Sequence, residues 1–245
     1  MPRALFYLAV IIIAEVVTTF YQPILGIACH SVILVAMLID SALIDRYFYG
    51  RFVLALSLIP LIRVISLSMP LADIPQIWWY PIIYLPLMAA AIVVMRILDY
   101  KPMDIGIRFG FIPFQLMIGL VGVGLGILEY IILIPEPLIT ELTWQTAWLP
   151  ALIIVLSTGF VEEFIFRGVL QKVSVEMFGG WGIVYVSFLF AILHIGFLSW
   201  VDVVLVFAIA LFFGWIVNRT KSIFGVVICH GIINIVLFII APFYF

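Results

Sequence analysis

The fold of this chain is decided by residues 147–171, which read AWLPALIIVLSTGFVEEFIFRGVLQ. The run is apolar for most of its length, and about 20 such residues are enough for a helix to cross the hydrocarbon core of a bilayer. It also carries Glu162, Glu163 and Arg167. A charge inside the bilayer costs several kcal/mol unless it is paired or hydrated. The stretch therefore predicts a membrane helix that contains a polar cluster.

The composition of the whole chain agrees with a membrane protein. Of its 245 residues, 67% are hydrophobic and 10% are charged, and the net charge is -2. Soluble domains carry about 25% charged residues. These values exclude a soluble globular domain, a disordered chain and a protein that binds nucleic acid through a basic face. The expected partners are membrane lipids and no nucleic acid.

Apolar segments recur along the chain, and their number predicts an all-α, polytopic transmembrane bundle of about eight or nine helices. The nine segments are 4–20, 24–39, 52–70, 80–98, 113–134, 147–171, 180–198, 201–217 and 222–242. In the eight-helix alternative, segment 24–39 is re-entrant or peripheral. We expect one integral membrane domain, with N-terminal helices in 1–98 and a core that carries the polar cluster in 99–245.

The basic residues favour nine helices. If nine helices alternate in direction, ten of the eleven Lys and Arg residues fall at one end of the bundle: Arg3, Arg46, Arg51, Arg96, Lys101, Arg108, Arg167, Lys172, Arg219 and Lys221. The positive-inside rule then predicts a cytoplasmic N-terminus and a C-terminus outside.

Six polar side chains at membrane depth lie on three late segments. They are Glu162, Glu163 and Arg167 in 147–171, His194 in 180–198, and His230 and Asn234 in 222–242. Glu163 and Arg167 are four residues apart, so they share a helix face and can form an ion pair. At about 1.5 Å per residue, Glu162, His194 and His230 all lie near the middle of a core about 30 Å thick, with a lean to the cytoplasmic half.

This set of residue types is suited to hydrolysis. A carboxylate and an imidazole can hold and deprotonate a water molecule, while a second imidazole and an amide can stabilise an oxyanion. The same carboxylate and two imidazoles also match the ligand set of a catalytic zinc, with Glu162, His194 and His230 as ligands. The spacing alone leaves both mechanisms open. An ion- or proton-coupled transporter could use the same groups.

Three motifs, in this order, resemble the CAAX protease and bacteriocin-processing family (CPBP, or Abi) of intramembrane proteases, which includes the Rce1-type prenyl-protein endopeptidases. They are Glu-Glu-x-x-x-Arg at 162–167, Phe-x-x-x-His at 190–194 and His-x-x-x-Asn at 230–234. Residues 104–108, Asp-Ile-Gly-Ile-Arg, resemble the stretch that precedes the core helices of that family. The resemblance covers about residues 100–240, and we expect a multi-pass protein of a prokaryotic cell membrane.

The resemblance implies a role for each of the six residues. Glu162 would be the general base that activates water, with help from His194. Arg167 would hold Glu163 and order the helix. His230 and Asn234 would form the oxyanion hole. The family has been described both as metalloproteases and as glutamate proteases without an essential metal. We favour the second mechanism, and a divalent metal such as zinc is the alternative.

The resemblance also implies a substrate class. We expect a peptide or protein with a lipidated or transmembrane C-terminus, of which a prenylated CAAX-type end is one kind. The alternative is the C-terminal membrane anchor of an exported protein, which myxosortase-like and archaeomyxosortase-like members are proposed to remove.

Two other features concern packing. Arg63 lies within a membrane segment, and we expect it to pair with Glu15 or Glu129. Gly122 and Gly126 form a small-xxx-small pair, which predicts a close contact between their helix and a neighbour.

Overall fold

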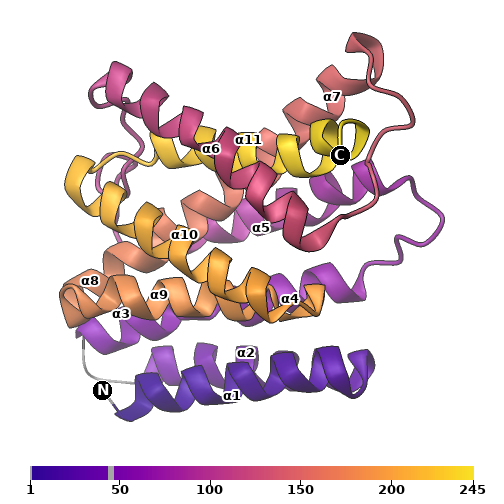
Figure 1. The fold of residues 1–245 in the computed structure, drawn as a ribbon. Helices are drawn as coiled ribbons and strands as arrows, with labels where there is room; N and C mark the ends of the chain where they lie inside the picture. Colours follow the sequence, from indigo (N-terminus) through magenta and orange to yellow (C-terminus); the bar gives the residue numbers. More distant parts are fainter. Residues whose placement is uncertain (1, 44–46) are drawn as a thin grey trace.

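The helices run side by side in the computed structural model, which describes residues 2–43 and 47–245 (Figure 1). The N-terminal helices are α1 (Pro2–Phe20), α2 (Pro23–Leu43), α3 (Tyr47–Leu56), α4 (Leu58–Ser68) and α5 (Gln76–Ile97). The later helices are α6 (Ile112–Leu133), α7 (Trp144–Ile154), α8 (Gln171–Phe178), α9 (Trp181–Ile192), α10 (Trp200–Thr220) and α11 (Phe224–Ile235). The predicted all-α class is confirmed.

Several of these helices join into longer spans. In the described part of the chain, eight helices are long and apolar enough to cross a membrane, including the joined spans Phe48–Ser68, Trp144–Phe178 and Phe224–Phe243. A ninth apolar helix, Trp181–Phe197, is shorter. Each of the nine predicted segments is therefore helical. The eight long helices agree in number with the eight-helix alternative, but the shorter helix is the seventh segment and not 24–39, because α2 has 21 residues.

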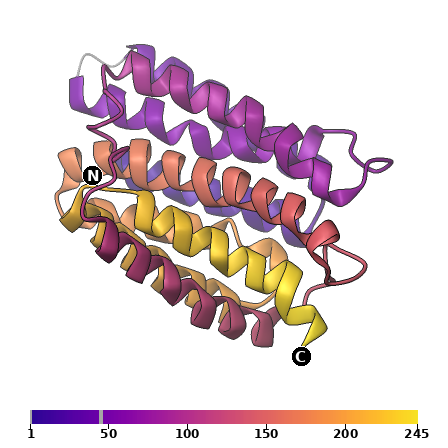
Figure 2. The ribbon, with the colours of Figure 1, turned by 90° about the horizontal axis from the view of Figure 1, so that it is seen from above.

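The basic connections gather at one end of the bundle. The segment between α5 and α6 packs against the turn between α10 and α11, where Arg108 Nε donates to the Lys221 carbonyl at 2.7 Å. In the same segment, the Tyr100 ring lies 4.8 Å from the Arg51 guanidinium and 5.9 Å from Lys172 Nζ. The two chain termini lie at opposite ends of the helices (Figures 1 and 2). These contacts agree with the predicted clustering, while the orientation in a membrane stays a prediction.

Two members of the predicted basic set differ from the rest. Arg46 lies outside the described residues. Arg167 is not at a helix end, because the Trp144–Phe178 span continues beyond it through α8, and its side chain is only 1% exposed. Its position follows from an acidic partner rather than from the membrane surface.

Helices α6 and α11 approach closely at the two predicted glycines. A Cβ atom added to Gly122 would lie 2.5 Å from the Cys229 carbonyl oxygen, and one added to Gly126 would lie 2.8 Å from that of Ile233. The prediction of a close helix contact is thus confirmed. Since each of these contacts falls one residue before a polar residue of α11, this packing sets the position of the candidate site.

The N-terminal and C-terminal parts share one apolar core. Phe52 of α3 packs edge-on against Phe178 of α8 and Tyr185 of α9, with ring centroids 5.1 and 5.5 Å apart. On the other side of the bundle, α1 and α2 lie together, away from α6 and α11 (Figure 1). The division of the chain near residue 99 stays a prediction.

Candidate active site

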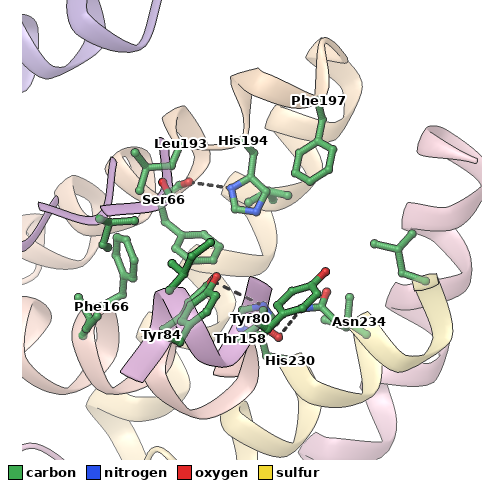
Figure 3. A pocket seen from close by; sticks show the side chains of 18 of the residues that line it. Ser66, Tyr80, Tyr84, Thr158, Phe166, Leu193, His194, Phe197, His230 and Asn234 are labelled. Carbon is green, nitrogen blue, oxygen red and sulfur yellow. Dashed lines mark hydrogen bonds and ion pairs between the residues drawn. The ribbon is translucent and has the colours of Figure 1, made fainter. Parts of the chain in front are cut away.

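A cavity of about 330 Å³ lies inside the bundle, and its walls come from helices that are far apart in the sequence. Its polar lining includes Glu162, His194, His230 and Asn234. Figure 3 shows His194 on one side of this cavity, and His230 and Asn234 on the other. Four of the six predicted side chains therefore face a single space. Glu163 and Arg167 lie behind its wall.

The two neighbouring glutamates point in different directions. They lie in a stretch where the Trp144–Phe178 span widens into π-helical turns, Val155–Glu162 and Phe164–Leu170. Such turns are rare and are frequently found at functional sites. Glu162 has an 18% exposed side chain and lines the cavity, whereas Glu163 is fully buried. Consecutive helical residues point roughly 100° apart, so one carboxylate can face the cavity while the other faces the protein.

Glu163 joins two of the predicted residues. Its Oε1 atom lies 3.1 Å from Arg167 Nη1 and accepts a hydrogen bond of 2.8 Å from His230 Nδ1. The Arg167 guanidinium also lies 4.3 Å from the centroid of the Phe190 ring, at a distance typical of a cation–π contact. A buried charge is tolerated only when it is paired, and Glu163 and Arg167 neutralise each other. The predicted ion pair is formed, and it also fixes the orientation of His230.

Glu162 has a second partner that the sequence did not reveal. The Tyr84 hydroxyl of α5 donates a hydrogen bond to Glu162 Oε1. The other carboxylate oxygen, Oε2, lies 3.9 Å from His230 Nε2. Tyr84 occupies one oxygen and leaves Oε2 facing the cavity. An ordinary tyrosine in an apolar helix gives no signal that would distinguish it from a packing residue.

His194 lies just past the end of α9, where the α-helix gives way to a turn and a short 3-10 helix, Ile195–Phe197. Its Nδ1 atom is 2.9 Å from the carbonyl oxygen of Phe190, one turn earlier. A carbonyl can only accept, so Nδ1 carries the proton, and Nε2 of the neutral ring is free to accept a hydrogen bond. The ring packs between Phe190 and Phe197, with centroids 4.9 and 5.8 Å away.

Asn234 is held by a second residue that we did not predict. Its Nδ2 atom donates to Thr158 Oγ1 at 2.8 Å (Figure 3). The Thr158 hydroxyl in turn donates to the Ile154 carbonyl at 2.9 Å. One amide hydrogen of Asn234 is thus used, and the other is available to the cavity. Thr158 precedes Glu162 by four residues on the same helix, and that spacing was the signal that could have identified it.

The zinc alternative does not fit this arrangement. Among residues 2–43 and 47–245, no group of three His, Cys, Asp or Glu side chains is placed to hold a metal ion. In the predicted ligand set, Nδ1 of His230 is bonded to Glu163 and Nδ1 of His194 to the Phe190 carbonyl, as is common for histidine metal ligands. A metal ion could therefore reach only Nε2 of each ring and Glu162 Oε2, and these atoms are not grouped to hold one. We therefore write the chemistry with protein groups only.

The mouth of the cavity lies away from the basic end of the bundle. Of the residues that line the cavity, Gln76 and Phe197 are exposed. Gln76 is the first residue of α5, and Arg96 lies at the other end of this 22-residue helix. At about 1.5 Å per residue, the two ends are roughly 30 Å apart. The cavity thus opens towards the end of the bundle opposite to the basic connections.

The comparison with protein families agrees with the geometry. Residues 144–236 match the family model described as type II CAAX prenyl endopeptidase Rce1-like. The matched range contains all six predicted residues, whereas Tyr84 lies outside it. No curated protein and no solved structure gives a match to the chain. Residues 144–236 therefore form a protease domain of the Rce1-like type, within a multi-pass integral membrane protein.

Proposed function

We propose that this chain, with its Rce1-like domain at residues 144–236, is an endopeptidase that hydrolyses a peptide bond inside or near the membrane. One observation carries the proposal. A carboxylate, two imidazoles and an amide from three separate apolar helices line a single cavity. Such groups are costly in lipid, so their convergence favours a catalytic role over simple helix packing.

In the proposed reaction, Glu162 acts as the general base. Its Oε2 atom accepts a proton from a water molecule that also donates a hydrogen bond to His194 Nε2. The resulting hydroxide attacks the peptide carbonyl and forms a tetrahedral oxyanion. Glu162 then gives the proton to the leaving amine, so the peptide bond breaks and the carboxylate is regenerated. General acid–base catalysis of this kind contributes about 10²- to 10⁴-fold to the rate.

His230 and Asn234 are the proposed oxyanion hole. Both line the cavity opposite His194, and each is held from behind by a polar partner, Glu163 and Thr158 respectively. A protonated His230 can donate from Nε2, and its charge balances the two carboxylates against Arg167. Donors fixed in advance stabilise the developing negative charge without having to reorient during the reaction.

The cavity also supports a choice between the two expected substrate classes. Its mouth lies at the end opposite to the basic connections, which the positive-inside rule places outside the cytoplasm. A prenylated CAAX-type end would be presented at the cytoplasmic surface. The location therefore favours the C-terminal membrane anchor of an exported protein as the substrate, with the cut made near the outer half of the membrane.

Cleavage by purified protein in lipid vesicles tests the proposed function. The assay uses a fluorogenic peptide with a transmembrane C-terminus, and a prenylated CAAX peptide for comparison. We expect Glu162→Gln to lower kcat at least 100-fold, because an amide cannot accept the proton. Glu141→Gln makes the same chemical change in an exposed loop and should leave kcat unchanged. Cleavage by Glu162→Gln at the wild-type rate would refute the assigned base.

The same vesicles separate a protease from an ion- or proton-coupled transporter, the alternative of another class. A transporter would move protons or ions across the vesicle membrane without cutting any peptide. Substitution of Glu162 would then abolish this flux. We expect peptide cleavage without such a flux.

A further inference from the structure

A second cluster of buried polar residues lies outside the Rce1-like domain, on the N-terminal helices. Glu15 on α1 is 1% exposed, His30 on α2 is fully buried, and the side chain of Arg63 on α4 is 19% exposed. Arg63 Nε donates to Glu15 Oε1 at 2.7 Å, and His30 Nε2 lies 3.3 Å from the same oxygen. Arg63 thus pairs with Glu15, one of the two partners that the sequence suggested.

Arg63 also reaches the candidate active site. Its Nη2 atom donates a hydrogen bond to the main-chain carbonyl of Leu193, the residue directly before His194. Both Arg63 and His194 line the cavity. The guanidinium therefore connects the N-terminal ion pair to the main chain at a residue of the proposed machinery.

The location of this contact gives it a specific effect. Helix α9 ends at Ile192, and the last carbonyls of a helix have no partner within that helix. A cationic donor at a helix C-terminus satisfies such a carbonyl and interacts favourably with the helix dipole. Arg63 therefore fixes the main chain at Leu193, and the Phe190 carbonyl fixes the ring of His194.

We propose that Glu15, His30 and Arg63 form a positioning network that holds His194 in place for catalysis. The inference rests on the proposed function, and it means that α1, α2 and α4 complete a site whose six predicted residues lie in 144–236. Glu15 neutralises Arg63 inside the membrane, so the guanidinium can reach a neutral carbonyl without leaving an unpaired charge. His30 packs against the pair and restricts the position of Glu15.

Arg63→Gln is the main test, measured as kcat and KM on the transmembrane peptide in vesicles. Because a displacement of about 1 Å can cost about 100-fold in rate, we expect kcat to fall 10- to 100-fold and KM to change less than threefold. Arg63→Lys keeps the charge without the forked geometry and should recover part of kcat. Arg108→Gln is the matched control, since Arg108 also caps a helix end, at Lys221, but lies away from the cavity.

The same substitution in a His194→Ala background separates positioning from a general structural role. If the network acts through His194, Arg63→Gln should have little further effect on the residual rate of that variant. An equal loss in both backgrounds would overturn the proposal.

Hydrogen exchange provides a readout that needs no activity. We expect Arg63→Gln, or Glu15→Gln if the first variant does not fold, to accelerate amide exchange at residues 193–197 and not at the α10–α11 turn. Unchanged exchange at 193–197 would also overturn the proposal. If the wild-type protein cleaves no peptide, the proposed function fails. If it cleaves and Arg63→Gln matches it, only the positioning role fails.

Discussion

Removal of the Arg167 guanidinium tests whether the buried ion pair holds the candidate site together. Arg167 Nη1 and Glu163 Oε1 are 3.1 Å apart, and neither side chain is more than 1% exposed. Two unit charges at this distance attract each other by about 5 kcal/mol at an effective dielectric constant of 20. Loss of one partner from a buried pair typically costs about 3–5 kcal/mol, because the other charge stays buried and unpaired. We expect Arg167→Leu to lower the free energy of unfolding by about that amount.

A double-mutant cycle separates the pair from its surroundings. Glu163→Leu should cost about as much as Arg167→Leu, and the double variant should cost at least about 2 kcal/mol less than the sum. Denaturant titration in bicelles, followed by tryptophan fluorescence, measures each value. The double variant should stay inactive although it is more stable than the sum of the two single effects predicts, because His230 has lost the carboxylate that orients it. If the two single effects add within about 0.5 kcal/mol, the residues do not act as a pair and this reasoning is wrong.

Three further outcomes are expected. Tyr84→Phe removes a hydrogen bond to the charged Glu162 and should lower kcat about 10-fold with little change in KM, as measured by initial rates on the transmembrane peptide. Gly126→Val should destabilise the fold by about 1–3 kcal/mol in thermal melts, because a side chain there meets the Ile233 carbonyl. Gly124→Val is its control, because a Cβ atom added there meets nothing within 4 Å, and it should change stability by less than about 0.5 kcal/mol. Incubation with a chelator, followed by the peptide assay, should leave the activity intact, and a loss that added zinc restores would contradict the metal-free reaction.

The sequence was most informative about the membrane-spanning segments, because an unpaired polar group or a non-helical backbone is energetically costly in lipid. Nine apolar segments predicted nine helices, and the small-xxx-small pair predicted the contact of Gly122 and Gly126 with α11. The ordered polar residues predicted a shared site, and Glu162, His194 and His230 do line one cavity. Polar groups in an apolar span have few ways to be satisfied, so their positions carry much information.

The contacts that we did not predict depend on how the helices pack together, and not on the spacing of residues along the sequence. Tyr84 becomes a partner of Glu162 only because α5 lies against the π-helical turns, and no pattern within α5 shows this. The partner of Arg63 was open between Glu15 and Glu129, since both are carboxylates on apolar helices and only the arrangement of α1 and α4 selects one. Helix ends were also missed, because a helix that stops inside an apolar run looks continuous in the sequence.

The end of α9 at Ile192 suggests how water, the second reactant of the proposed hydrolysis, reaches a site inside the membrane. Beyond Ile192 the α-helix gives way to a turn and a short 3-10 helix, Ile195–Phe197, and main-chain groups at such an end can hydrogen-bond water beside the cavity mouth. A volume of about 330 Å³ corresponds to about ten water molecules at liquid density. A bound segment displaces most of this hydration, so turnover requires a substrate that fills the space incompletely. A ligand that fills this cavity completely is therefore expected to inhibit the proposed reaction, because it leaves no water molecule beside the Glu162 carboxylate.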